Sequence, residues 1–189
     1  MIVIGLTGEK RGGKGTFTEL LTELLPHAKI IRLGFGDIIG DICDILGMPR
    51  TRDNMQEVPL WLIEGSGNKG IITDAMKRRI EKLDTDIAIL DGIRTIPDKA
   101  MLETFPRHLL VYVTASLETR YQRAIKAAEK VGDATLTREK FLAQDNAKIE
   151  QMIPVIGARA DYIIQNEGTL DEYRAKVEAV RKYFIYPAE

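Results

Sequence analysis

The chain has 189 residues, 44% of them hydrophobic, which suits a single domain with one sizeable core. Lys and Arg total 27 against 28 Asp and Glu, so the overall charge excludes the strong field that draws proteins onto nucleic acid or an anionic membrane. Cys43 is the single cysteine, which excludes an internal disulfide and fits a reducing compartment. The apolar run at residues 1–6 is too short for a signal peptide or a membrane span. We therefore expect a cytoplasmic protein without nucleic-acid or membrane partners.

Strands and helices are predicted to alternate along the chain. Short apolar runs typical of strands buried on both faces lie at residues 2–6, 30–33, 87–90, 109–113 and 162–164, the second of them being the least regular. Between them the apolar period becomes that of amphipathic helices, as over residues 17–25, 117–128 and 170–184. This pattern predicts an α/β fold: a five-stranded parallel sheet flanked by helices, with a ligand crevice at the carboxyl ends of the strands.

Two stretches interrupt the alternation and are interpreted as insertions within the single domain. Residues 34–82 contain two or three predicted helices, including an amphipathic one at 37–46. Residues 130–155 are basic around a turn predicted at Gly132. Both insertions are placed to act as mobile covers of a site.

A glycine-rich segment follows the first predicted strand and opens the first predicted helix. It consists of Gly8, Glu9, Lys10, Arg11, Gly12, Gly13, Lys14, Gly15 and Thr16. In this context glycines let the backbone amides curl around phosphate groups, the helix N-terminus favours negative charge, and Lys14 can reach the β- and γ-phosphates. A glycine-rich turn without a ligand needs neither so many glycines nor a lysine at this place. The segment therefore predicts a phosphate-binding loop for ATP with Mg²⁺.

The phosphate loop departs from the strict Walker A pattern at one position. Gly15 stands where Ser or Thr directly follows the lysine, and Thr16 comes one residue later. A loop ending Gly-Lys-Gly-Thr resembles that of adenylate kinases, members of the P-loop nucleoside-monophosphate-kinase superfamily. The resemblance implies a three-layer P-loop NTPase fold, with the first insertion binding the acceptor and the second acting as a lid. It also implies that the metal is held mainly by phosphate oxygens and water, with Thr16 as an indirect ligand.

The third predicted strand ends in an acidic residue, Asp91, followed by Gly92, Ile93 and Arg94. A carboxylate there can bind Mg²⁺ or its waters, as a Walker B aspartate does. An N-cap for the next helix is the alternative, but Pro97 lies too far along the chain for Asp91 to cap it well. The stretch resembles the Asp-Gly-Phe-Pro-Arg-Thr of adenylate kinases, and more closely the Asp-Gly-Ile-Arg of archaeal adenylate-kinase-related and dephospho-CoA-kinase-like proteins. The resemblance implies that Arg94 binds the phosphate of the acceptor.

Two arginines, Arg120 and Arg123, are three residues apart on the helix after the fourth strand, on a face predicted to lie away from its apolar stripe. Their spacing fits a solvated basic face as well as a functional pair. Kinases of the resembled type carry an Arg-x-x-Arg here, which implies that Arg120 and Arg123 contact the ATP base and the transferring phosphoryl group, with a catalytic role in stabilising charge.

The first insertion matches the resemblance less well. Asp37 occupies the place of the Gly-Asp pair that opens the acceptor-binding helix in adenylate kinases, but Gly40 stands where an arginine is usual. Arg50, Arg52 or Lys69 are alternatives for the missing charge, and their spacing does not choose between them.

The last predicted strand leads into Asn166, in an Ala-Asp, apolar run, Asn-x-Gly ending that resembles deoxynucleoside-monophosphate kinases and dephospho-CoA kinases. The resemblance implies that Asn166 lies near the ATP base. A plain polar turn, with Thr169 as the N-cap of the following helix, is an equal alternative.

These features predict transfer of the ATP γ-phosphoryl group to a small phosphate-bearing acceptor, such as a nucleoside or deoxynucleoside monophosphate. A dephospho-CoA-kinase-like enzyme, a nucleotide-binding regulatory ATPase and a kinase that has lost its acceptor remain alternatives. No Asn-Lys-x-Asp motif is present, which speaks against a GTPase switch. The sequence leaves open the acceptor, the preference between ATP and GTP, and the oligomeric state.

Overall fold

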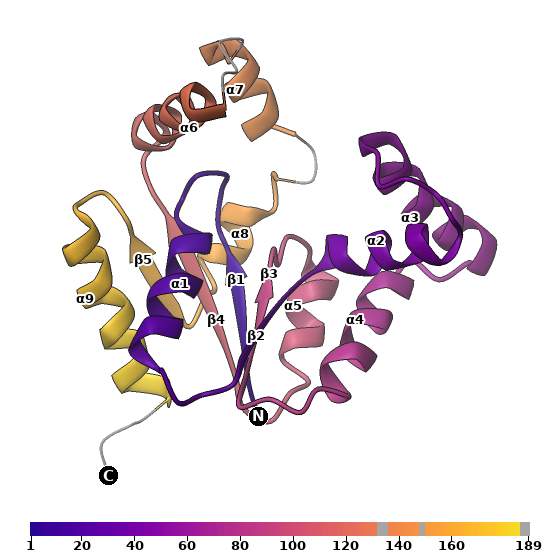
Figure 1. The fold of residues 1–189 in the computed structure, drawn as a ribbon, viewed down its shortest axis with the longest axis horizontal. Coiled ribbons are helices and arrows are strands. Elements are labelled where there is room, and N and C mark those ends of the chain that lie inside the picture. Colours follow the sequence, from indigo (N-terminus) through magenta and orange to yellow (C-terminus); the bar gives the residue numbers. More distant parts are fainter. Residues whose placement is uncertain (132–135, 148–149, 186–189) are drawn as a thin grey trace.

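A five-stranded parallel sheet forms the centre of the protein in a computed structural model that describes residues 1–131, 136–147 and 150–185. The strand order is β2-β3-β1-β4-β5 (Figure 1). The strands are β1 (Ile2–Thr7), β2 (Ile30–Gly34), β3 (Ile87–Asp91), β4 (His108–Thr114) and β5 (Tyr162–Gln165). The predicted fold class is confirmed, and every strand end lies within one residue of its predicted place. All six residues of β1 are buried, as expected for the central strand.

Helices cover both faces of the sheet because successive strand residues point to opposite sides. On one side Ile4 and Leu6 pack with α1 (Lys14–Leu24) and α9 (Leu170–Val180), which continues into the short π-helix η1 (Arg181–Ile185). On the other side Val3 belongs to a core with residues of α4 (Ile71–Glu81), α5 (Ile96–Leu102) and α8 (Ile153–Gly157). The result is a three-layer α/β/α arrangement (Figure 1).

The chain between β2 and β3 contains α2 (Phe35–Ile45), α3 (Arg52–Ser66) and α4, the upper number of helices predicted for this insertion. Its small core consists of the buried residues Ile39, Cys43 and Val58. The thiol of Cys43 is free and fully buried in this core, as is typical of an inert cysteine. In Figure 1 α2 and α3 project to one side of the sheet.

Above the carboxyl ends of the strands lie α6 (Leu117–Val131) and α7 (Arg138–Asp145) (Figure 1). The predicted lid-like stretch, residues 130–155, includes α7 and the start of α8. The turn predicted at Gly132 lies outside the described residues. Within the described part of the chain, no helix has both the length and the apolar character needed to cross a bilayer.

Candidate active site

The phosphate loop connects β1 to α1 through backbone that only glycine adopts without strain. Gly8 has φ 148° and Gly13 has φ 119°, both outside the range of ordinary side chains. A Cβ on Gly8 would lie 2.0 Å from the carbonyl oxygen of Val113, so β4 approaches too closely for any other residue. The predicted strand–loop–helix context is therefore present, with the first turn of α1 at the carboxyl end of the central strand.

Lys14 is the first residue of α1, and its ammonium folds back over the loop. It donates hydrogen bonds to the carbonyl oxygens of Gly8 and, at 3.2 Å, of Glu9. Burial lowers the pKa of Lys14 below its usual value, and the nearby carboxylate of Asp91 opposes this shift. A buried ammonium that is held only by carbonyl oxygens gains from a bound anion, since phosphate oxygens would replace the solvation it has lost.

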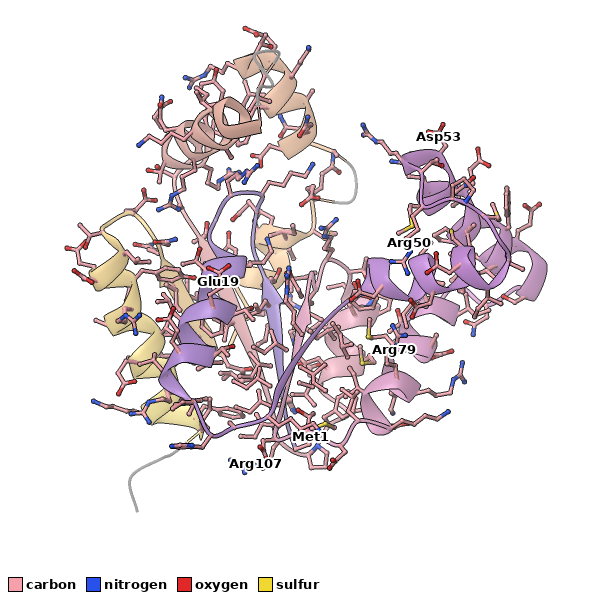
Figure 2. The ribbon with its side chains drawn as sticks, in the orientation of Figure 1. Met1, Glu19, Arg50, Asp53, Arg79 and Arg107 are labelled. Atoms are coloured by element: carbon pink, nitrogen blue, oxygen red, sulfur yellow. The ribbon has the colours of Figure 1, made fainter. Side chains whose placement is uncertain are left out.

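A cavity of about 530 Å³ opens beside the loop. That volume falls within the range of small-molecule sites. Glu19 of α1, labelled in Figure 2, is on its wall. The other lining residues are Arg11, Gly13, Lys14, Gly15, Thr16, Asp91, Arg123, Asn166, Gly168, Thr169, Leu170 and Tyr173. The fold thus gathers predicted site residues from the loop, β3, α6 and the chain after β5 around one space. The other predicted site residues do not line this cavity: Gly8, Glu9, Lys10, Gly12, Asp37, Arg94 and Arg120.

Asp91 ends β3, beside Leu6 of β1. One oxygen of its carboxylate pairs with Arg32 of β2, and the other, Oδ1, is buried without a hydrogen-bond partner. An unpartnered carboxylate oxygen at the cavity wall fits a water-bound Mg²⁺. Among the described residues no group of three His, Cys, Asp or Glu could enclose a metal. Any Mg²⁺ here would therefore depend on phosphate oxygens and water, as the resemblance implies.

The loop after β3 is fixed from both ends. The amides of Gly92 and Ile93 donate to the carbonyl oxygen of Leu6 at 3.1 and 3.0 Å. The buried carboxylate of Asp98 accepts from the amides of Arg94 and Thr95 at 3.3 and 3.0 Å. Thr95, rather than Asp91, is the N-cap of α5, so the capping alternative for Asp91 was wrong. These bonds fix the backbone of Arg94, which does not line the cavity but whose charge acts on Lys14 and contributes to lowering its pKa.

The guanidinium of Arg94 has an acidic partner that the sequence did not indicate. Its Nη1 lies 3.3 Å from Oε1 of Glu150, a residue on the segment between α7 and α8. The side chain of Glu150 is 6% exposed and that of Arg94 is 40% exposed. The carboxylate of Glu150 also raises the pKa of Lys14, opposing the effect of burial. Its charge therefore acts on both Arg94 and Lys14.

Arg120 does not lie where it was predicted. Its residue is 6% exposed, and its guanidinium makes paired hydrogen bonds to the carboxylate of Asp145 on α7 and one to the carbonyl oxygen of Ala115. Its Cζ lies 5.9 Å from the ring centre of Phe141. The solvated-face alternative is therefore wrong for Arg120: α7 packs over this side of α6, because Phe141 and the Asp145 carboxylate give Arg120 both an apolar and a charged partner. A nucleotide contact by Arg120 stays a prediction.

Arg123 and Asn166 hold the loop together. Arg123 donates to the carbonyl oxygen of Asn166 at 2.8 Å and lies 3.4 Å from that of Arg11. The side-chain nitrogen Nδ2 of Asn166 donates to the carbonyl oxygen of Gly12 at 2.9 Å. Tyr173 of α9, which sequence reasoning did not single out, donates to the carbonyl oxygen of Gly13 at 3.0 Å. Arg123 and Asn166 thus support the loop backbone as well as lining the cavity.

Beneath the loop, one oxygen of the Glu9 carboxylate accepts from the hydroxyl of Tyr112 on β4, and the other is buried without a partner. Burial and this hydrogen bond raise the pKa of Tyr112 to about 12. Glu9 is therefore anchored to the sheet, while its backbone carbonyl accepts from Lys14.

The residues of the first insertion mostly satisfy one another. The side chain of Asp37 accepts from the amide of Gly34 at 2.6 Å and so caps α2. A Cβ on Gly40 would lie 2.6 Å from Cζ of Arg50, so the guanidinium of Arg50, and not that of Arg52, rests on Gly40. Arg50 also pairs with Asp41 and Asp44. Figure 2 shows Arg50 beside α2.

Of the site contacts that the sequence analysis missed, only the Thr95–Asp98 capping box has a recognisable sequence pattern. Thr95 followed three residues later by Asp98 matches the capping-box pattern that also marks Thr169 and Glu172, and Thr169 is the N-cap of α9 as predicted. Arg32 and Glu150 carried no such pattern.

Trp61 is half exposed, with no part in the cores described.

Comparison with curated proteins finds relatives of the same length. A UPF0200 protein of Thermococcus sibiricus is 27% identical over 98% of this chain and 100% of its own length. UPF0200 proteins of Hyperthermus butylicus and Methanoculleus marisnigri are each 29% identical, over 88% and 95% of both chains. No family model matches the chain. The chain is thus similar along its length to the UPF0200 proteins.

Solved structures share the fold at low sequence identity. Shikimate kinase from Acinetobacter baumannii, in complex with shikimate, superposes with a TM-score of 0.56 at 17% identity, covering 100% of this chain and 96% of the other. Shikimate kinase from Bacteroides thetaiotaomicron has a TM-score of 0.60 at 12% identity, covering 96% and 97%. The protein therefore has the α/β fold of the shikimate kinases, with its five parallel strands in the order 2-3-1-4-5.

Proposed function

We propose that the protein transfers the γ-phosphoryl group of ATP to a small phosphate-bearing acceptor, with nucleoside and deoxynucleoside monophosphates as the first candidates. The observation that carries this proposal is the phosphate loop: Gly8 has a positive φ and is pressed against β4, Gly13 also has a positive φ, and the half-buried ammonium of Lys14 lies over the loop. Solved structures with this fold include proteins named kinases, which supports the class of reaction.

Four charged residues are assigned parts in this reaction: Lys14, Arg123, Asp91 and Arg94. Lys14 and the loop amides bind the β- and γ-phosphates, and Arg123, on the cavity wall, stabilises charge on the transferring group. Mg²⁺ bound here would neutralise phosphate charge, and the free oxygen of Asp91 and the hydroxyl of Thr16 would hold its waters. Arg94 binds the phosphate of the acceptor. A phosphate monoester loses its second proton near pH 6, so the acceptor is already an anionic nucleophile and needs no catalytic base.

The test is an ADP-forming coupled assay across nucleoside monophosphates, deoxynucleoside monophosphates and dephospho-CoA. We expect ATP consumption in proportion to one added acceptor. Turnover that no acceptor changes would contradict the proposal and favour a regulatory ATPase. Turnover with dephospho-CoA alone would favour the alternative of a dephospho-CoA-kinase-like enzyme.

Lys14→Ala is the matched inactive variant, and we expect it to lower kcat at least about 100-fold. Lys77→Ala, which removes a lysine of α4 that pairs with Glu81 on the surface, is the control. Circular dichroism of both variants checks that the fold is retained.

A further inference from the structure

Glu150 is a buried carboxylate placed at the guanidinium assigned to the acceptor. Its side chain is 6% exposed, and its Oε1 lies 3.3 Å from Nη1 of Arg94. Because a buried charge without a partner is strongly unfavourable, Glu150 depends on Arg94 for compensation. The acceptor phosphate and Glu150 are therefore two anions that need the same cation.

The chain that carries Arg94 is fixed at its backbone. The Arg94 amide is bonded to Asp98, and Ile93 next to it is fully buried. Glu150 lies outside the helices, between the end of α7 at Asp145 and the start of α8 at Ile153. Arg94 also lies outside the helices and strands, between β3 and α5, so both partners are carried by connecting chain.

We infer that Glu150 is a specificity-determining residue that acts through Arg94: it occupies the guanidinium while the acceptor place is empty, and the phosphate of the acceptor displaces it. This rests on the proposed function. A phosphate dianion offers Arg94 two parallel hydrogen bonds and more charge than a carboxylate, so it can displace Glu150. An uncharged nucleoside cannot, and acceptors without a phosphate group are excluded.

Glu150→Gln tests the inference, because it removes the competing charge and keeps the shape. We expect the KM of the nucleoside monophosphate with the highest turnover to fall roughly three- to tenfold, the KM of ATP to stay unchanged, and activity on uncharged nucleosides to stay absent. In an Arg94→Ala background the same substitution should leave the acceptor KM unchanged, because its effect passes through Arg94. Glu23→Gln, which removes the surface partner of Arg174, is the control.

Inorganic phosphate provides a readout that does not need catalysis. In calorimetric titrations we expect Glu150→Gln to bind phosphate more tightly than the wild type by a similar factor. If no acceptor supports turnover but phosphate binding tightens, the kinase proposal fails and the displacement inference stands. If turnover is found but neither acceptor nor phosphate affinity improves in the variant, the inference about Glu150 fails and the kinase proposal stands.

Two further outcomes would overturn the inference. An acceptor KM that rises in Glu150→Gln would mean that Glu150 holds Arg94 in its productive position. A fall in kcat of about 100-fold or more with the acceptor KM unchanged would assign Glu150 to proton transfer from a hydroxyl acceptor. If Glu150→Gln does not fold, Glu150→Asp retains the charge but draws it back by one methylene, and the same KM should fall by a smaller factor.

Discussion

Some buried polar groups near the phosphate loop lack partners, whereas the charged groups of the first insertion pair with one another. Around the loop a lysine is buried and carboxylate oxygens of Glu9 and Asp91 have no partner. In the insertion Asp37 caps its own helix and Arg50 pairs with neighbouring aspartates. Unsatisfied buried groups mark a place prepared for a ligand, whereas satisfied surface groups mark a helix that is stable as it stands. Under the proposed function the ATP side of the site is therefore preformed, and we expect recognition of the acceptor to come from Arg94, in the loop after β3.

Gly8→Ala, in the phosphate loop, is expected to cause the largest loss of stability. The new methyl would meet the carbonyl oxygen of Val113 at 2.0 Å and force a positive φ on alanine, so we expect the free energy of unfolding to fall by roughly 2 to 4 kcal/mol. Urea titration measures it. Gly15→Ala is the matched control in the same loop: its Cβ meets no atom within 4 Å, and stability should change by less than about 0.5 kcal/mol. Equal losses would mean that the loop is not pressed against β4.

Arg94→Ala tests whether acceptor recognition lies at the sheet. Losing a charge-assisted contact should raise the acceptor KM roughly 10- to 100-fold and leave the KM of ATP nearly unchanged. Steady-state kinetics with each substrate varied in turn gives both values. Equal increases for the two substrates would remove Arg94 from the acceptor side.

Asp37 tests whether a polar group of the first insertion serves stability or acceptor binding. If its carboxylate serves mainly as a cap, Asp37→Ala should lower stability by about 1 kcal/mol and hardly change the acceptor KM, since one bond to the amide of Gly34 is lost. Asp37→Asn retains an oxygen acceptor and should recover most of that loss. Thermal unfolding and kinetics are measured on both. A large rise in acceptor KM with unchanged stability would instead assign Asp37 the binding role that the resemblance implies.

Tyr112→Phe should change how the free energy of unfolding depends on pH in the alkaline range. The phenol of Tyr112 titrates at about 12 in the folded protein and near 10 when unfolded, so the neutral form is favoured by folding. Its contribution to stability is complete below pH 10 and is lost as pH rises toward 12. Between these values the wild type should lose stability more steeply than the variant in urea titrations, while Tyr173 contributes equally to both. Parallel slopes would mean that Tyr112 is not buried against Glu9.

Local signals in the sequence determined the strands, the phosphate loop and the inert cysteine. Apolar runs such as residues 2–6 identify buried strands, and the spacing of Gly8, Gly13 and Lys14 is a property of one short segment. Likewise, Thr169 lies next to the helix that it caps. In each case the physical cause acts within a few residues, so the pattern is visible before the chain folds.

Tertiary structure alone decided which charges meet. Arg94 and Glu150, Arg32 and Asp91, and Arg120 and Asp145 are pairs distant in sequence, joined only when the sheet and α7 assemble. Helical spacing placed Arg120 opposite an apolar stripe, but could not show that α7 would cover it. A charge takes its role from the partner that packing brings to it, and in this protein packing pairs Arg94 with Glu150.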